Sequence, residues 1–231
     1  MSRFTFAALF ACASTLAPGI SAQQAVDSSF HPRVERPVYP AGTGPVVLFD
    51  EAHNSFHSLG RSFRPFAELL RLDGYRVAPL AAKLSAAALT DADILVIVNV
   101  LAAENVGNWK LPTPSAYTPD EIEAVRRWVN DGGSLLTFRP GIITYEPTVA
   151  WQFDGVPAGS AAGMLQGAAR VLAAGRVVVL GEAAMLTAQV AGPNRRPMGM
   201  NAPVARQNQR FVLNLMHWLS GGPERVDGES K

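Results

Sequence analysis

An acidic–histidine cluster follows the first long apolar run after the N-terminal segment: Asp50, Glu51, His53 and His57 lie within eight residues. Side chains of these types can bind a divalent metal such as zinc, or act as general acid and base without a metal. The zincin pattern H-E-x-x-H is not matched, because Glu51 precedes the first histidine. A structural alternative is that Asp50 caps the next segment while the histidines hydrogen-bond within the loop. These interpretations stay open, and the candidate metal set is Asp50, His53 and His57.

Further polar residues follow other predicted strands. Asn99 ends an apolar strand at 93–99, and Glu182 follows a strand at 176–180. Ligands of open α/β sheets bind beyond the carboxyl ends of the strands, so these residues could share one crevice with the cluster. We assign catalytic roles to Glu51, His53 and Glu182, with His53 as general acid or base and a carboxylate as its partner. Ligand-binding roles are assigned to Asp50, Asn54 and Asn99.

A second candidate site is the loop at 192–201, which glycine and proline frame. Arg195 and Arg196 could hold an anionic ligand through bidentate hydrogen bonds, and Asn201 ends the loop. The alternative is that both arginines are solvated or pair with surface carboxylates. The expected partner is a small molecule or a cell-envelope ligand.

Several classes of function are disfavoured. Asp50-Glu51-Ala52-His53 is similar to the acidic box of ATPases, but the chain has no G-x-x-x-x-G-K-[ST] phosphate loop. The G-x-S-x-G elbow of many serine hydrolases is also missing. The 20 Lys and Arg residues balance 19 Asp and Glu residues, and no basic stripe carries interleaved aromatics. Nucleic acid is therefore not an expected partner.

Residues 1–22 are typical of an export signal. Arg3 supplies positive charge, an apolar stretch runs to Leu16, and Ala22 offers a small residue at the cleavage position. No apolar run reaches the length of a membrane span. The single cysteine, Cys12, lies in this segment; lipid attachment there is the less favoured alternative, and cleavage after Ala22 would leave no thiol nucleophile. We expect a periplasmic or secreted protein.

The elements that must position these residues alternate between strands and helices. We predict an extended arm or linker at 23–44, one domain at 45–221 and a disordered tail at 222–231. Strands are expected at 46–49, 75–80, 93–99 and 134–138, helices at 63–72, 85–89, 118–131 and 211–219, a hairpin at 168–180, and a polar loop at 187–207. Thr118, Pro119 and Glu121 form the pattern of a capping box. Such alternation predicts a three-layer α/β fold with a mostly parallel sheet between helices, closed by a hairpin and a final helix.

Three stretches resemble a bacterial family of exported proteins without an established activity. They are FDEAHN at 49–54, RPFAELL at 64–70 followed by DGY at 73–75, and GRVVVLGEAAM at 175–185. The resemblance implies the class I glutamine amidotransferase-like, flavodoxin-like fold, although the amidotransferase cysteine is missing from the mature chain. Family members place an Asp-His pair after the fourth strand, where this chain has Arg139-Pro140.

Two functions follow from these observations. One is a hydrolase-type enzyme, with or without a metal, that acts on a cell-envelope or carbohydrate-like substrate. The other is a non-catalytic ligand-binding or assembly domain that keeps the amidotransferase-like fold without its nucleophile.

Overall fold

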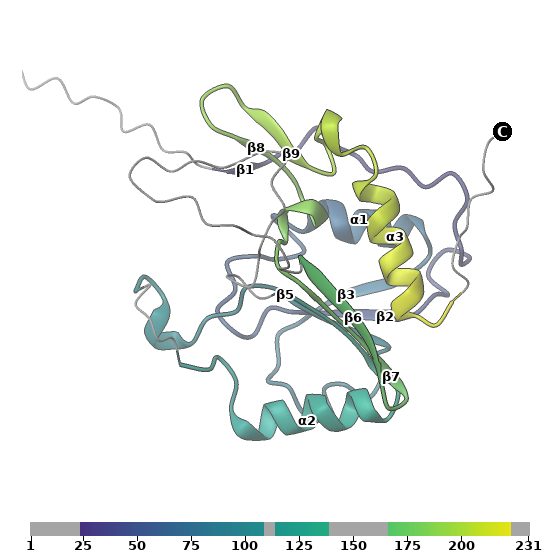
Figure 1. The fold of residues 1–231 in the computed structure, drawn as a ribbon, viewed down its shortest axis with the longest axis vertical. Coiled ribbons are helices and arrows are strands. Elements are labelled where there is room, and N and C mark those ends of the chain that lie inside the picture. Colours follow the sequence, from purple (N-terminus) through teal and green to yellow (C-terminus); the bar gives the residue numbers. More distant parts are fainter. Residues whose placement is uncertain (1–23, 109–113, 139–165, 223–231) are drawn as a thin grey trace, which may run out of the picture.

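The computed structural model describes residues 24–108, 114–138 and 166–222. Its main sheet has six strands in the order β3-β2-β4-β5-β7-β6 (Figure 1). The parallel strands are β2 (Val46–Asp50), β3 (Arg76–Leu80), β4 (Ile94–Ile97), β5 (Ser134–Phe138) and β7 (Gly175–Leu180). The edge strand β6 (Gly167–Leu172) pairs antiparallel with β7. The predicted α/β class and closing hairpin are confirmed.

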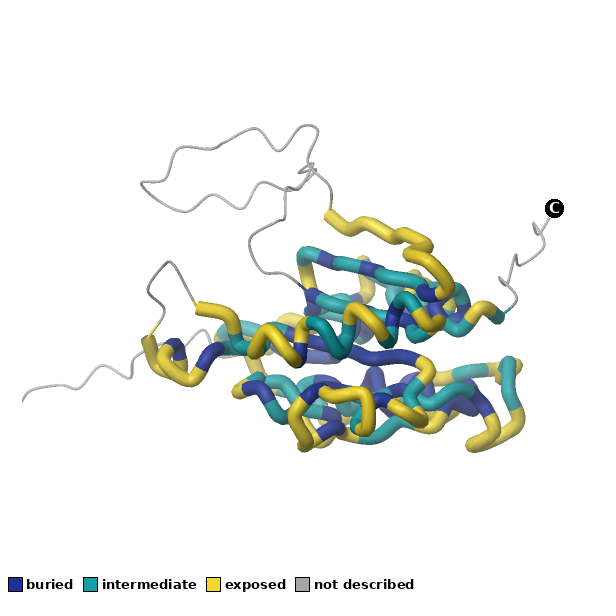
Figure 2. Tube along the Cα trace, turned by 90° about the horizontal axis from the view of Figure 1, so that it is seen from below, coloured by how far each residue is buried: buried dark blue, intermediate teal, exposed yellow. Residues whose placement is uncertain are grey.

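Helices cover both faces of this sheet (Figure 1). Helices α1 (Arg64–Leu72) and α3 (Asn208–Leu219) lie on one face, and α2 (Pro119–Asn130) lies on the other. Each face has its own apolar cluster: Phe66 and Met216 belong to the α1 and α3 side, while Val125 and Trp128 of α2 pack against Leu95. Figure 2 shows the buried strands between layers whose outer faces are exposed.

The capping box of α2 forms as the sequence predicts. The Glu121 backbone N–H donates to Thr118 Oγ1 (3.3 Å), and the Thr118 backbone N–H donates to Glu121 Oε2 (3.0 Å). Pro119 occupies the first helical position, where a missing N–H costs nothing. These contacts fix the N-terminal end of α2 at the sheet edge where the site lies.

The prediction of a helix at 85–89 is wrong. This stretch is a turn, in which the Leu89 backbone N–H donates to the Ser85 carbonyl (3.1 Å) and the Ser85 hydroxyl accepts from the Ala88 backbone N–H (3.1 Å). Its alanines offer little apolar area, and a short helix depends on burying such area. The serine hydroxyl also competes for the backbone donors that a helix needs.

The polar loop predicted at 187–207 contains a second sheet instead. Strands β8 (Ala188–Ala191) and β9 (Arg196–Gly199) form a hairpin, and β1 (Ala25–Val26) pairs with β8. This small sheet lies on the same side of the main sheet as α1 and α3 (Figure 1). The strands are too short to show an alternating pattern, and Pro197 within β9 argues against a strand in the sequence.

Residues 24–44, predicted as an arm or linker, pack on the domain. Besides the pairing of β1, the Val38 backbone N–H donates to Asp73 Oδ1 (2.9 Å), and the Tyr39 ring meets the edge of Tyr75 at 5.2 Å between centroids. The fully buried Asp73 also accepts from Nε2 of the fully buried His217 (2.5 Å). One carboxylate thus joins the arm to the last helix.

The predicted export segment at 1–22, most of the predicted tail and the Arg139-Pro140 stretch lie outside the described residues. Within the described ranges, no helix has the length and apolar character needed to cross a membrane.

Candidate functional site

The candidate site lies where the loops after β2 and β4 meet. These strands are neighbours, and the chain leaves β2 toward α1 on one face and β4 toward α2 on the other, which makes this the topological switch point of the sheet. The two loops are joined directly: the Leu101 backbone N–H donates to the His53 carbonyl (3.2 Å), and the Ser55 hydroxyl donates to the Val98 carbonyl (2.8 Å). The amide of Asn54 donates to the Leu101 carbonyl (3.2 Å), so this predicted ligand-binding residue ties the loops together.

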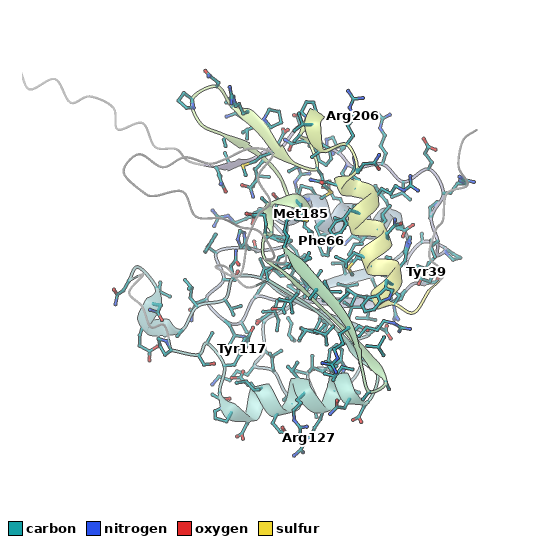
Figure 3. All side chains as sticks on the ribbon, viewed as in Figure 1. Tyr39, Phe66, Tyr117, Arg127, Met185 and Arg206 are labelled. Carbon is teal, nitrogen blue, oxygen red and sulfur yellow. The ribbon has the colours of Figure 1, made fainter. Side chains whose placement is uncertain are left out.

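A buried hydrogen-bond network surrounds His53. Both carboxylate oxygens of the fully buried Asp50 lie 2.9 Å from His53 Nδ1, and His53 Nε2 lies 2.9 Å from Glu121 Oε1. The Tyr117 hydroxyl donates to Asp50 Oδ2 (2.6 Å), and Figure 3 shows Tyr117 between the strand ends and the start of α2. The His53 ring therefore lies between two carboxylates, with one ring nitrogen facing each of them.

Glu121 links this network to two other segments. Its Oε1 accepts from the Leu84 backbone N–H (3.2 Å) as well as from His53, and its Oε2 accepts from Thr118. Burial alone would raise the pKa of Glu121, but the hydrogen bonds from Thr118 and His53 outweigh it and lower the pKa to about 2. Burial, together with the neighbouring Asp50 carboxylate, raises the pKa of Tyr117. Glu121 stays ionised and Tyr117 stays protonated at neutral pH.

This network has the geometry of a structural connection. It joins the end of β2, the loop after β3 and the start of α2. The His53 side chain is only 8% exposed, and both of its ring nitrogens are occupied. It has no free nitrogen for proton transfer to a substrate or for a metal.

The other predicted catalytic carboxylates have different partners. Glu51 Oε1 accepts from the Leu59 backbone N–H (2.8 Å), and Glu182 Oε1 accepts from the Ala184 backbone N–H (2.7 Å). Among the described residues neither carboxylate bonds to His53. Each carboxylate thus accepts from a backbone N–H of its own loop, and the shared crevice of Glu51, Glu182 and His53 stays a prediction.

A second cluster contains His57 and Asn99, which the sequence singled out, and Ser62, which it did not. His57 Nδ1 lies 2.8 Å from Ser62 Oγ, and His57 Nε2 lies 3.2 Å from Asn99 Nδ2. Burial lowers the pKa of His57, so its ring is neutral at pH 7. Asn99 has a φ of 45°, a left-handed conformation that asparagine tolerates better than most residues.

This cluster opens into a pocket of about 370 Å³ between β1 and the loop after β2. Its polar side includes His57, Arg61 and Ser62, and its apolar side includes Val26 and Phe56. The complete lining is Gln24, Ala25, Val26, Phe56, His57, Arg61, Ser62 and Gln189. The pocket thus combines one cation with neutral donors and an exposed aromatic ring, and no carboxylate lines it.

The predicted metal set is not assembled. In the described part of the chain, no group of three or more His, Cys, Asp or Glu side chains is arranged to hold a metal ion. His57 bonds to Ser62 and Asn99, while His53 bonds to Asp50 and Glu121. The two histidines therefore do not act on one ion.

The residues of the second predicted site, the loop at 192–201, have different surroundings. Asn201 donates to Asp27 Oδ2 (2.8 Å) and to the Gln189 carbonyl (2.9 Å), so it holds the N-terminal arm on the small sheet. The hydrogen bonds from Ser29 and Asn201 lower the pKa of Asp27. Arg195 lies in the turn between β8 and β9, and Arg196 begins β9; both are exposed, and their ligand-binding role stays a prediction.

Three residues of these clusters were missed as site residues. The sequence predicts Glu121 as a capping residue, which explains the contacts of Oε2 with Thr118 but not those of Oε1 with His53 and Leu84. Tyr117 and Ser62 carry no motif, since one precedes a helix cap and the other precedes α1. Only the fold brings Tyr117 to Asp50, across 67 positions of the sequence.

No family model matches the chain, and no curated protein matches it. Among solved structures, the chain is similar to the "mmIFT52 N-terminal domain" at 12% identity, covering 78% of this chain and 100% of that one, with a TM-score of 0.49. It is also similar to "Cytoplasmic Protein STM1381 from Salmonella typhimurium LT2" at 12% identity, covering 75% and 98%, with a TM-score of 0.41. At these scores the likeness assigns neither a family nor a function.

Proposed function

We propose that the protein is a small-molecule-binding α/β domain whose ligand carries an anionic group and occupies the pocket beside His57. The observation that carries this proposal is the guanidinium of Arg61. Arg61 is one of the residues that line the pocket, and its guanidinium forms no hydrogen bond or ion pair with any described residue. By contrast, Arg64 pairs with Glu68, and Arg126 pairs with Glu123.

The chemistry of the pocket favours an anion over a cation. Arginine offers a rigid fork of N–H donors that matches a carboxylate or phosphate. Ser62 lines the same pocket with a polar side chain, and no acidic side chain lines the pocket to repel the ligand. Phe56, with 57% of its surface exposed, offers a ring face for an apolar or aromatic part of the same molecule.

This proposal corresponds to the ligand-binding alternative of the sequence analysis. The hydrolase alternative assigns catalysis to Glu51, His53 and Glu182. Glu51 and Glu182 accept hydrogen bonds within their loops, and both ring nitrogens of His53 face carboxylates. We do not carry hydrolysis forward with those residues. A cell-envelope ligand remains compatible with the pocket, provided that it carries a phosphate or carboxylate.

Two wider proposals accompany the binding function. The first is membership of the flavodoxin-like, amidotransferase-like group of folds. When the five parallel strands are numbered along the chain, their order in the sheet is 2-1-3-4-5, which is the flavodoxin-like order. The second is a location outside the cytoplasm, supported by the export-signal pattern of residues 1–22.

Calorimetric titration with phenyl phosphate tests the binding function, with uncharged phenol as the ligand control. Phenyl phosphate should bind and phenol should not. Arg61→Ala should weaken binding at least about tenfold, because a hydrogen bond to a charged group contributes roughly 1.5–3 kcal/mol. Arg170→Ala, the same change at an exposed position of the edge strand β6, should leave the affinity unaltered. Equal affinities of the wild type and Arg61→Ala would contradict the proposal, as would the absence of saturable binding.

A further inference from the structure

We propose that the same pocket hydrolyses carboxylic esters that carry an anionic group, with Ser62 as the nucleophile and His57 as its general base. This inference rests on the proposed function, because Arg61 would hold the anionic group of the substrate. The hydrogen bond of 2.8 Å between Ser62 Oγ and His57 Nδ1 carries it. Both side chains line the pocket, so a bound ester can reach the hydroxyl.

The environment of His57 suits a base. Its ring is partly buried, and burial holds its pKa below the usual value, so the neutral form that can accept a proton is present at pH 7. Two aromatic rings fix its position: the centroids of Phe56 and Phe63 lie 4.2 and 5.3 Å from that of the imidazole. The His57 backbone N–H also donates to the Ser55 hydroxyl (3.1 Å). The base is thus held by both its ring and its backbone.

Asn99 decides which ring nitrogen carries the proton. When its amide NH₂ donates to His57 Nε2, the proton of the ring is on Nδ1 and is donated to Ser62. After a half turn of the amide, Asn99 Oδ1 accepts from Nε2–H, and Nδ1 accepts the proton of the Ser62 hydroxyl. Only the second arrangement prepares Ser62 for attack. Asn99 is therefore a positioning residue: its backbone is left-handed, and its amide lies 3.2 Å from Nε2 of the imidazole.

The reaction needs only the ester and water. The Ser62 oxygen attacks the carbonyl carbon while its proton passes to Nδ1 of His57. The bond to the alcohol oxygen breaks, and the leaving alcohol takes that proton, which leaves an acyl-serine. Water then attacks the carbonyl carbon of the acyl-serine while one of its protons passes to Nδ1 of His57. The bond to the Ser62 oxygen breaks, Ser62 takes that proton, and the carboxylic acid is released. Arg61 lines the same pocket, and its positive charge there favours the negative charge that develops on the carbonyl oxygen.

Labelling with a fluorophosphonate probe tests the nucleophile directly. The wild type should be modified at Ser62, as located by peptide mass spectrometry, and Ser62→Ala should not be labelled. Ser85→Ala, at an exposed turn position, is the matched control and should label as fast as the wild type. His57→Gln should slow labelling at least about tenfold, as expected when a general base is removed. Absence of label from Ser62 in the wild type, or a smaller drop in His57→Gln, would overturn the inference.

Two variants of Asn99 test its positioning role. Asn99→Gly keeps the left-handed backbone and removes the amide, so labelling should slow. Asn99→Asp offers only acceptor oxygens to Nε2–H, so labelling should return at least to the wild-type rate. A merely structural role predicts no rescue by aspartate, and wild-type rates in Asn99→Gly would remove Asn99 from the mechanism.

Titration of Ser62→Ala with phenyl phosphate separates this inference from the proposed function. The variant should still bind, because Arg61 and the pocket wall remain. Binding without labelling of the wild type would reject the serine chemistry and keep the binding function. Labelling without binding would reject the anionic ligand, and with it the substrate class proposed here.

Discussion

Glu121→Gln is the sharpest test of the buried network. The substitution keeps the shape of the side chain but removes its charge, and it brings an NH₂ group to a position that now accepts hydrogen bonds. Oε1 accepts from His53 and Leu84, and Oε2 accepts from Thr118. In either orientation of the amide, the NH₂ faces a donor. The variant should therefore lose at least one buried hydrogen bond and leave His53 with one carboxylate, that of Asp50.

The size of the effect follows from the pKa of Glu121. A carboxyl group whose pKa falls from 4.5 to about 2 on folding contributes about 3 kcal/mol to the free energy of unfolding at neutral pH. Breaking a buried ion pair by removing one partner costs a similar amount, roughly 3–5 kcal/mol. Since whole domains are stable by only about 5–15 kcal/mol, the loss should be large but measurable in a folded variant.

Urea unfolding, followed by tryptophan fluorescence from pH 7 to pH 3, measures this contribution. The folded-state pKa lies below the unfolded one, so the stabilisation is complete well above pH 4.5 and is lost as the pH falls toward about 2. The difference in the free energy of unfolding between the wild type and Glu121→Gln should therefore be largest at pH 7 and should decrease below pH 4.5. The control is Glu123→Gln on the same helix. Glu123 forms exposed ion pairs with Arg126 and Arg127, and water screens these pairs. A gap equal to that of the control, or constant from pH 7 to pH 3, would refute the network as described.

Three further predictions concern other contacts. Tyr117→Phe removes the donor to Asp50 and should lower the free energy of unfolding by about 2 kcal/mol in urea; an unchanged value would show that the hydroxyl is dispensable. Gly74→Ala, at a φ of 92°, should cost about 3 kcal/mol by the same measurement, because the added methyl group would meet the Tyr39 carbonyl; wild-type stability would contradict this packing. Finally, mass spectrometry of the exported protein should find a chain that begins after Ala22, and a lipid-modified N-terminus would contradict that cleavage site.

Most of the main sheet could be predicted from sequence because its strands are continuous apolar runs. Strands buried on both faces need such residues at every position, and Ile94–Ile97 satisfies this completely. The small sheet could not be predicted in this way. Its strands are two to four residues long, and they are stabilised by contacts with the arm, which the sequence presents as irregular.

The site was predictable in its location but not in its contacts. Asp50 and His53 are close in sequence, so their pairing could be expected, whereas Glu121 reaches His53 across 68 positions. Its capping role already explained it, and nothing in the pattern shows that its second oxygen faces inward. Ser62 could not be predicted for another reason. The G-x-S-x-G elbow is only one way to place a serine for activation, and a loop that brings His57 beside Ser62 needs no such motif.

The docking of the N-terminal arm has a consequence for maturation. Gln24, Ala25 and Val26 line the proposed pocket, so cleavage after Ala22 would create a new chain end one residue before that lining. The freed α-amino group would be largely protonated at neutral pH and would add a positive charge to the chain one residue before Gln24. Removal of the export signal would then alter affinity as well as location. The precursor should hold an anion more weakly than the processed protein, and ligand capture would begin after the protein has left the compartment in which it was made.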